Sequence, residues 1–105
     1  MPDHDFQSKQ LKALSNTKRL QIMEWIIDPL NHFEAQLDGH LVTDGVCIGR
    51  IVDKVKLSQP TVTSHMKVLE EAKLVTSKKI KNWVFYKPDP EAIKHLFSTL
   101  EKRLL

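Results

Sequence analysis

The sequence predicts a mainly α-helical domain with one small β-hairpin, and three observations carry this prediction. Apolar residues recur every three or four positions over much of the chain, which is the period of an amphipathic helix. One stretch, residues 74–87, is instead rich in β-branched and aromatic residues around Asn82, as expected for two strands and a turn. The 105 residues fit one domain spanning residues 1–105, long enough to bury a core without disulfides.

Two helices are predicted in the first third of the chain. Residues 6–14 form the first, and Ser15 or Asn16 can cap the start of the second. The second helix carries an apolar stripe at helical spacing, made of Leu20, Met23, Ile26 and Ile27. Pro29 ends this helix, because the residue before a proline avoids the α region.

A long acidic insertion, residues 29–45, follows the second helix. Pro29, Gly39 and Gly45 interrupt it, and its apolar residues show no clear period. The insertion is therefore interpreted either as a long loop or as a segment with a short hairpin or helical turn of its own. A connection of this length is unusual in a small domain and is often functional or mobile.

Two short helices joined by a tight turn are predicted over residues 46–72. The first has an apolar stripe of Ile48, Ile51, Val52 and Val55. Lys56 and Leu57 form the turn, and Ser58 caps the second helix, with Pro60 in its first turn. The buried face of the second helix consists of Val62, Met66 and Leu69, flanked by His65 and Ala72. This arrangement is a helix-turn-helix.

A hairpin and a last helix complete the chain. Residues 73–87 form the hairpin, with Asn82 as the turn residue. Its aromatic residues are interpreted as hairpin core, and they are Trp83, Phe85 and Tyr86. Asp89 caps the last helix, residues 89–105, with Pro90 at its first position. The apolar stripe of this helix comprises Ile93, Leu96, Phe97, Leu100 and Leu104.

The charge of the chain is distributed unevenly. From Lys54 to Lys87 there are eight lysines and only two acids, whereas from Asp28 to Asp44 there are four acids and no lysine or arginine. A basic third beside an acidic segment favours a face made for a polyanion, and the alternative is a solvated lysine surface.

The sequence carries no sign of a membrane or secretory protein. No apolar run approaches the ~18 residues of a membrane span. The N-terminal residues lack the apolar core of a signal peptide, and Cys47 is the only cysteine. We therefore expect a cytoplasmic protein without an internal disulfide.

Helix, turn, helix and a lysine-bearing hairpin together predict a winged helix-turn-helix that binds double-stranded DNA. The second helix of such a motif places its N-terminal residues at base edges in the major groove, so its exposed side chains should be short and polar. The predicted DNA-binding residues are Ser58, Gln59, Pro60, Thr61, Thr63, Ser64, His65 and Lys67 on that helix, and Lys78, Lys79 and Lys81 on the hairpin. Ordinary surface residues are the alternative, and for His65 a packed histidine bonded to the backbone.

Three segments resemble the ArsR/SmtB family of prokaryotic winged-helix repressors. They read LKALSNTKRLQIM, LSQPTVTSHMKVLEEAKLV and NWVFYK, and the resemblance covers about residues 9 to 97. Thr17 stands where the family has proline, Thr63 where it has serine, and Lys73 where a glycine usually ends the helix.

The resemblance implies a homodimer that binds an imperfect inverted repeat, blocks transcription and is released by a ligand or a redox event. It implies a dimer interface built from the first and last helices, residues 1–14 and 89–105. The corresponding residues here are Phe6, Leu11, Leu14, Leu96, Phe97, Leu100 and Leu104. The apolar stripes on both terminal helices argue for a partner independently of the resemblance.

The family's two metal sites do not fit this chain. Cys47 occupies the first position of a Cys-x-Cys pair, but Gly49 occupies the second. In the last helix, Pro90 and Ala92 stand where the first ligands belong. We therefore predict no metal and no cofactor.

The effector is left open by the sequence. Candidate sensor residues are Cys47, His32 and His40, for redox, metal or proton sensing. An inert thiol and a solvated acidic loop are the alternatives, as are a small-molecule pocket under the insertion or no effector at all.

A winged helix that contacts another protein is the main alternative to sequence-specific DNA binding. An enzyme is not expected, because the sequence has no Gly-rich phosphate loop, nucleophile elbow or paired-histidine zinc motif.

Overall fold

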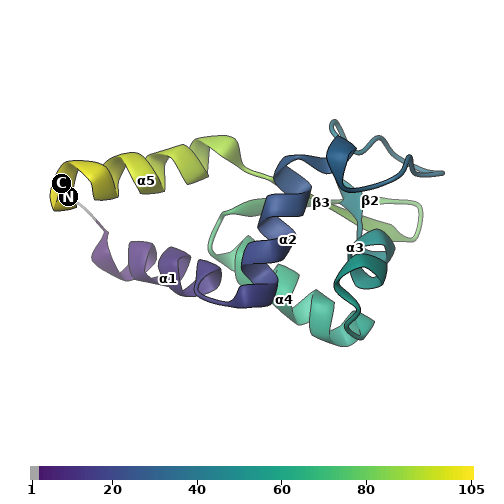
Figure 1. Ribbon diagram of the computed structural model, residues 1–105, viewed down its shortest axis with the longest axis horizontal. Coiled ribbons are helices and arrows are strands. Elements are labelled where there is room, and N and C mark those ends of the chain that lie inside the picture. The colour runs from purple at the N-terminus through teal and green to yellow at the C-terminus, as the bar shows by residue number, and fades with distance from the viewer. Residues whose placement is uncertain (1–2) are drawn as a thin grey trace.

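The computed structural model describes residues 3–105 and has the predicted mainly α architecture with a small hairpin. The elements are α1 His4–Leu14, α2 Thr17–Ile27, the 3-10 turn η1 Pro29–Asn31, β1 Val46–Cys47, α3 Ile48–Val55, α4 Gln59–Glu71, β2 Val75–Ile80, β3 Trp83–Pro88 and α5 Pro90–Leu104. The molecule is elongated, 44 × 25 × 23 Å. In Figure 1, α1 and α5 extend to one end, while α3, α4 and the hairpin occupy the other.

Side-chain caps start three helices where the sequence predicts them. Of the two candidates for α2, Asn16 is the cap, and its side chain accepts the N–H of Arg19 at 3.0 Å. Ser58 caps α4, and the carboxylate of Asp89 accepts the N–H of Ala92 at 3.1 Å to cap α5. Each cap satisfies a backbone donor that the helix itself leaves free, which fixes where the helix begins.

The sheet has three antiparallel strands in the order β1-β3-β2. β2 and β3 form the predicted hairpin, and Lys81 in its two-residue turn adopts the left-handed conformation, with φ 56°. β1 pairs with the other edge of β3 through Val46 and Tyr86. The sequence did not predict β1, because a two-residue strand has no measurable period.

The core lies where α2, α3 and α4 meet the sheet. Its fully buried side chains include Ile22, Ile26, Ile51, Val62, Met66, Leu69, Leu74 and Phe85. The predicted stripes of α3 and α4 are confirmed by this burial. Lys73 follows α4 with φ 62°, in the left-handed conformation for which the family usually has glycine.

Two apolar assignments from the sequence are wrong. On α2, Leu20 and Ile27 are 47% and 53% exposed, because the face that packs on β3 is centred on Ile22 and Ile26 instead. Trp83, predicted as hairpin core, is 48% exposed. It begins β3 next to the hairpin turn, beyond the reach of the core that buries Phe85.

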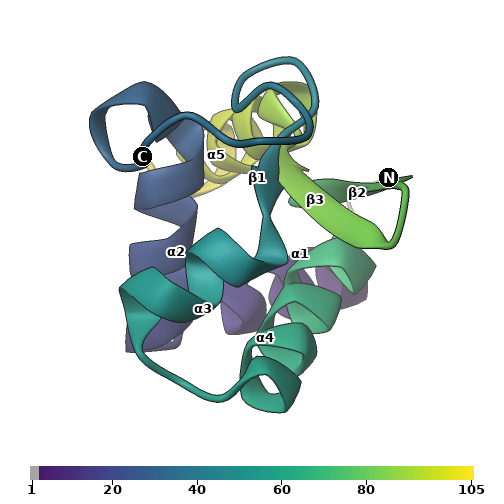
Figure 2. The same ribbon diagram turned by 90° about the vertical axis from the view of Figure 1, so that its right-hand side faces the viewer.

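The insertion, residues 29–45, contains a helical turn and is docked on the body of the protein. In Figure 2 it passes over the end of the sheet formed by β1 and β3. The side chain of Gln36 ties the middle of the insertion to β1, because its Oε1 accepts the N–H of Cys47 at 2.6 Å and its Nε2 donates to the carbonyl of Gly45 at 3.1 Å. Leu41 is buried in the core. The helical-turn alternative is therefore the one observed.

Candidate nucleic-acid interface

α3 and α4 are joined by a tight turn, and α4 packs on the body of the protein with one side only. Lys56 ends α3 in the left-handed conformation, with φ 59°, and its N–H donates to the carbonyl of Val52 at 2.9 Å. Three residues of α4 are completely buried, namely Val62, Met66 and Leu69. Because this side of α4 packs against the body, its opposite side faces solvent.

The exposed side of α4 carries short polar residues close to its N-terminus. The exposed residues are Ser58, Gln59, Pro60, Thr61, Thr63, Ser64 and Lys67. The hydroxyls of Ser58 and Thr61 lie 2.9 Å apart, and either can donate to the other. Hydroxyl and amide groups of this kind can both donate to and accept from base edges, and the helix N-terminus favours a phosphate.

His65 lies at the edge of this face and contacts Arg19 of α2. One guanidinium nitrogen lies 3.1 Å from His65 Nδ1, and Arg19 Nε donates to the carbonyl of Ala13 at 2.6 Å. Arg19 thus connects the end of α1 with α4. From the sequence, His65 was predicted to bind DNA, with a packed histidine bonded to the backbone as the alternative; the structure gives it a side-chain partner 46 residues away.

We predict that His65 is neutral at pH 7. Burial lowers its pKa from the ordinary value of 6.5, and the charge of Arg19 lowers it further. As the pH falls below 6.5, the unfolded chain binds this proton before the folded protein does, so the free energy of unfolding decreases until the folded pKa is passed. NMR titration of the His65 ring should therefore give a midpoint below 6.5, and a midpoint at or above 6.5 would contradict this prediction.

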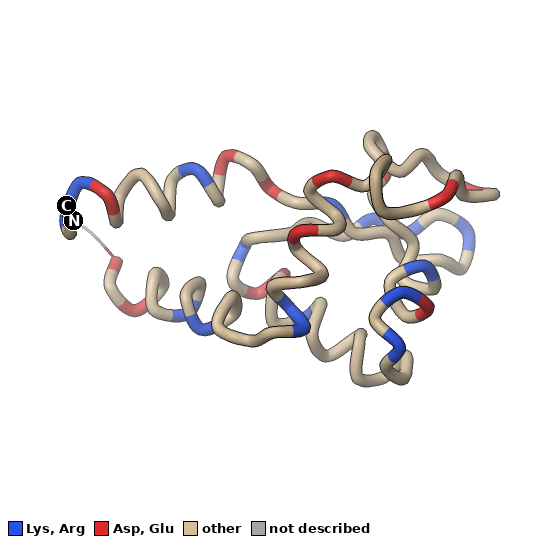
Figure 3. The backbone as a smooth tube through the Cα atoms, in the orientation of Figure 1, with Lys and Arg blue, Asp and Glu red and all other residues tan. Residues whose placement is uncertain are grey.

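The hairpin lysines lie beside the acidic insertion. Lys78 Nζ is 2.6 Å from a carboxylate oxygen of Asp44, and Lys81 Nζ is 2.9 Å from one of Asp38. Figure 3 shows the acids of the insertion and the lysines of the hairpin at the same end of the molecule. Lys79 is exposed. The sequence did not predict these pairs, although the opposite charges of the two segments are a signal that could have indicated them.

The candidate sensor residues do not form one cluster. Cys47 is half-buried at the start of α3 and lines a cavity of about 260 Å³ with Arg50 and Trp83. His40 is exposed, and its Nδ1 accepts the N–H of Val42. His32 is half-buried at the end of η1. Within residues 3–105, no three His, Cys, Asp or Glu side chains are close enough together to hold a metal ion.

The terminal helices expose apolar side chains on each side of an open groove. Leu11 of α1 is 40% exposed, and Phe97 and Leu104 of α5 are 53% and 74% exposed. The groove has a volume of about 330 Å³, and its apolar lining includes Leu11, Leu100 and Leu104. Phe6, Leu14 and Leu100 are half-buried.

The assignment of Leu96 to the dimer interface is wrong. Its side chain is completely buried within the protomer, so it belongs to the protomer's own core. Gln7 and Gln10 occupy buried positions on α1 that the apolar pattern did not indicate. The amide of Gln10 donates to the carbonyl of Ala72 at 3.1 Å and so ties α1 to the end of α4.

The tight turn between α3 and α4, the exposed polar face of α4 and the adjoining hairpin define a winged helix-turn-helix DNA-binding domain. A sequence profile described as bacterial regulatory protein, arsR family, matches residues 46–77. The uncharacterized HTH-type transcriptional regulator YbzH of Bacillus subtilis is 38% identical over 93 residues, which cover 89% of this chain and 93% of that protein. The chain belongs to the ArsR family, and the resemblance seen in the sequence is confirmed.

Solved structures of similar proteins have the same fold. HlyU from Vibrio cholerae matches with a TM-score of 0.65 and 22% identity, over 96% of each chain. The homodimeric winged helix-turn-helix DNA-binding domain of Mb0332 from Mycobacterium bovis matches with a TM-score of 0.65 and 20% identity, over 92% of this chain and 76% of that one.

Family membership determines the general function of the protein. It is a DNA-binding transcriptional regulator and not an enzyme. None of the helices in the described part of the chain is long and apolar enough to span a membrane.

Proposed function

We propose that the protein is a homodimeric repressor that binds an inverted-repeat operator and is released by a signal still to be identified. The observation that carries the proposal is the division of α4 into two faces. Val62, Met66 and Leu69 are completely buried, while the opposite face presents small polar side chains to solvent. A helix anchored in this way can approach the floor of a major groove closely without losing core contacts.

The residues of this interface have separate roles. Base edges are contacted by Gln59, Thr61, Thr63 and Ser64. A phosphate binds to Ser58 and the N-terminus of α4. Lys67 and the hairpin residues Lys78, Lys79 and Lys81 contact the backbone, and Pro60 packs close to it. His65 is assigned to positioning α4 through Arg19 rather than to direct readout.

The proposed dimer forms through α1 and α5. Phe97 and Leu104 are large apolar residues left exposed by a single protomer, and Leu104 also lines the apolar groove between α1 and α5. A second copy would cover both features at once, since an interface with two-fold symmetry uses the same patch twice. The homodimeric state of the Mycobacterium bovis domain, which has the same fold, supports a homodimeric state for this protein.

The test is selection of bound duplexes from a random pool. We expect an inverted repeat with half-site centres about 34–36 Å apart, one turn of DNA. Affinity should fall roughly 10³-fold or more between 50 and 200 mM salt, because several phosphates are neutralised. If no duplex binds even at low salt, the DNA-binding proposal fails and a protein-binding role becomes the better explanation.

Substitutions on α4 should separate base contacts from phosphate contacts. Gln59→Ala and Ser64→Ala are each expected to weaken operator binding by ~1–3 kcal/mol and to change binding to random DNA little. Lys67→Ala is the matched control, because a phosphate contact should be lost equally from both duplexes. Equal losses on both duplexes for Gln59→Ala would show that Gln59 contacts only the backbone.

A further inference from the structure

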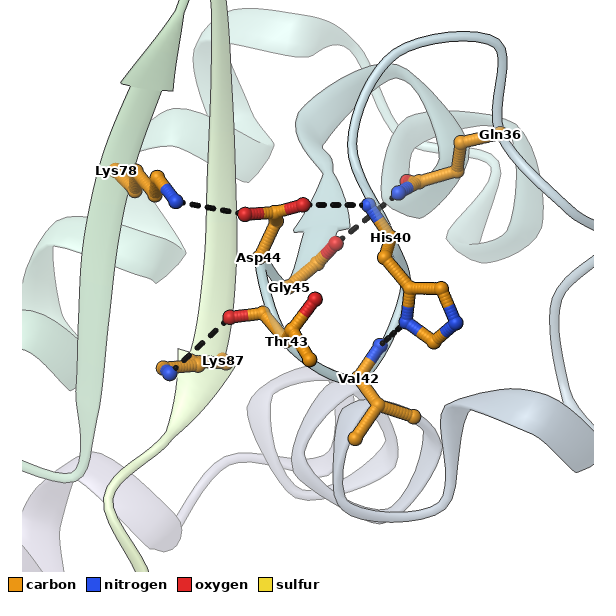
Figure 4. A network of polar contacts seen from close by, with 8 residues as sticks. All are labelled: Gln36, His40, Val42, Thr43, Asp44, Gly45, Lys78 and Lys87. Carbon is orange, nitrogen blue, oxygen red and sulfur yellow. Dashed lines mark hydrogen bonds and ion pairs between the residues drawn. The ribbon is translucent and has the colours of Figure 1, made fainter.

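Two carboxylates of the insertion pair with lysines of the DNA-binding hairpin. Asp44 lies 2.6 Å from Lys78 Nζ, and Asp38 lies 2.9 Å from Lys81 Nζ. Lys87 on β3 donates to the carbonyl of Thr43, also in the insertion. Figure 4 shows the contacts of Lys78 and Lys87 converging on residues 43–44 from the hairpin side.

Asp44 is oriented by its own loop. One carboxylate oxygen accepts the N–H of His40 at 2.7 Å, while the other faces Lys78 (Figure 4). The Asp44 N–H in turn donates to the carbonyl of His40 at 2.9 Å. The bond from Lys78 and the bond from His40 lower the pKa of Asp44 below its usual value of 3.8, so the carboxylate is charged at neutral pH.

The loop that carries these acids is fixed against the sheet. Gly45 has φ +105°, and a Cβ there would lie 2.5 Å from the carbonyl oxygen of Tyr86. Gly39 has φ +77°, and a Cβ there would lie 2.9 Å from the ring of Phe85. Only glycine allows such close approach, so the residue after Asp44 packs against the backbone of β3, and the residue after Asp38 packs against the ring of Phe85 on β3. The two carboxylates therefore have defined positions.

The lysines remain accessible to a competing anion. The side chains of Lys78 and Lys81 are 57% and 71% exposed, whereas those of Asp44 and Asp38 are only 21% and 33% exposed. An ion pair this close to solvent contributes little to stability. A DNA phosphate can therefore replace the carboxylate without disrupting the fold.

We infer that the acidic insertion is an autoinhibitory element that mimics phosphate. Asp44 and Asp38 compete with DNA for Lys78 and Lys81, and this inference rests on the proposed backbone contacts of the hairpin. Binding then exchanges a carboxylate for a phosphate, and the freed carboxylate takes up a cation. The affinity for DNA is therefore lower than it would be if the hairpin lysines were unpaired. The net number of ions released on binding is also smaller than the number of lysines that contact phosphates.

The test compares Asp44→Asn with Glu34→Gln. Both remove one negative charge from the insertion, but Glu34 is exposed and contacts no lysine within residues 3–105. Binding to a labelled random-sequence duplex is measured by fluorescence anisotropy from 50 to 200 mM salt. Asp44→Asn should bind about three- to tenfold more tightly at the lowest salt, with a salt slope steeper by up to ~0.9 for each lysine released. Glu34→Gln should change affinity less than about twofold.

A double-mutant cycle shows whether the effect passes through Lys78. In a Lys78→Gln background, Asp44→Asn should no longer strengthen binding, because the competed lysine is absent. If Glu34→Gln strengthened duplex binding as much as Asp44→Asn, or if Asp44→Asn still strengthened it without Lys78, the effect would come from net charge alone. Either result would overturn the inference. An unchanged or weaker affinity for Asp44→Asn would overturn it too. If the unmodified protein binds no duplex at all, it is the proposed function that fails.

Discussion

Phe97→Glu is expected to convert the protein to monomers. Phe97 is 53% exposed in the protomer, so the substitution leaves the protomer's core intact. In the proposed dimer the same side chain is covered by a second copy, where an unpaired carboxylate is strongly unfavourable. We expect the dimer dissociation constant to rise by about 100-fold or more, which corresponds to ~2.7 kcal/mol. Sedimentation velocity at micromolar concentration measures this directly.

Ser98→Glu is the matched control for Phe97→Glu. Ser98 is the next residue of α5, exposed and on the side away from the apolar stripe. It receives the same charge, and the dimer should persist. Loss of the dimer should also weaken binding to the two-half-site operator far more than binding to a single half-site, since linked half-sites bind as one ligand. A Phe97→Glu protein that remains dimeric would place the interface on another surface.

Local signals in the sequence predicted the helices and their boundaries well. A cap such as Asn16 or Asp89 bonds to a backbone N–H only three residues later, so the interaction is visible in a short segment. The buried face of α4 was likewise predicted, because a 13-residue helix repeats its apolar pattern several times. The hairpin was predicted from its composition and from Asn82 as the turn residue, whereas the residue of the turn that adopts the left-handed conformation is Lys81.

The features that the sequence did not predict depend on distant contacts. Asp44 and Lys78 are 34 residues apart, and Arg19 and His65 are 46 apart. The uneven charge of the chain was interpreted as a face for a polyanion, and charge totals do not show which acid pairs with which lysine. The burial of Leu96 within the protomer was not predicted either, because it too depends on contacts with residues distant in the sequence. An apolar stripe on a terminal helix shows which face is covered, not whether the covering residues belong to the same chain.

The candidate interface is correspondingly divided into predictable and unpredictable parts. The polar face of α4 follows from helical geometry once Ser58 and Val62 are placed. Which hairpin lysines are in ion pairs follows only from the docked insertion. The sequence alone does not distinguish a paired lysine from a free one. Helical periodicity therefore predicted which residues of α4 face outward. Tertiary contacts determine which hairpin lysines are free to bind phosphate.

Gly45→Ala should be the most destabilising single-methyl change in the insertion. The new Cβ would meet the carbonyl oxygen of Tyr86 at 2.5 Å and its carbon at 2.7 Å, and φ +105° is strained for any L side chain. Neither contact is relieved by rotating a side chain, since both atoms belong to the backbone of β3. We expect a loss of ~2–4 kcal/mol in the free energy of unfolding, measured by urea denaturation.

Gly49→Ala is the control for Gly45→Ala, because it adds the same methyl group four residues later without a predicted loss of stability. A Cβ at Gly49 meets no atom within 4 Å, and the residue lies in the first turn of α3. Alanine there should be neutral or should raise the free energy of unfolding by up to ~1 kcal/mol, because it limits the unfolded chain and favours the helix. If both alanines had the same small effect, the insertion would not be held against β3 as tightly as Gly45 implies. The fixed carboxylates proposed to compete with DNA would then lose their structural basis.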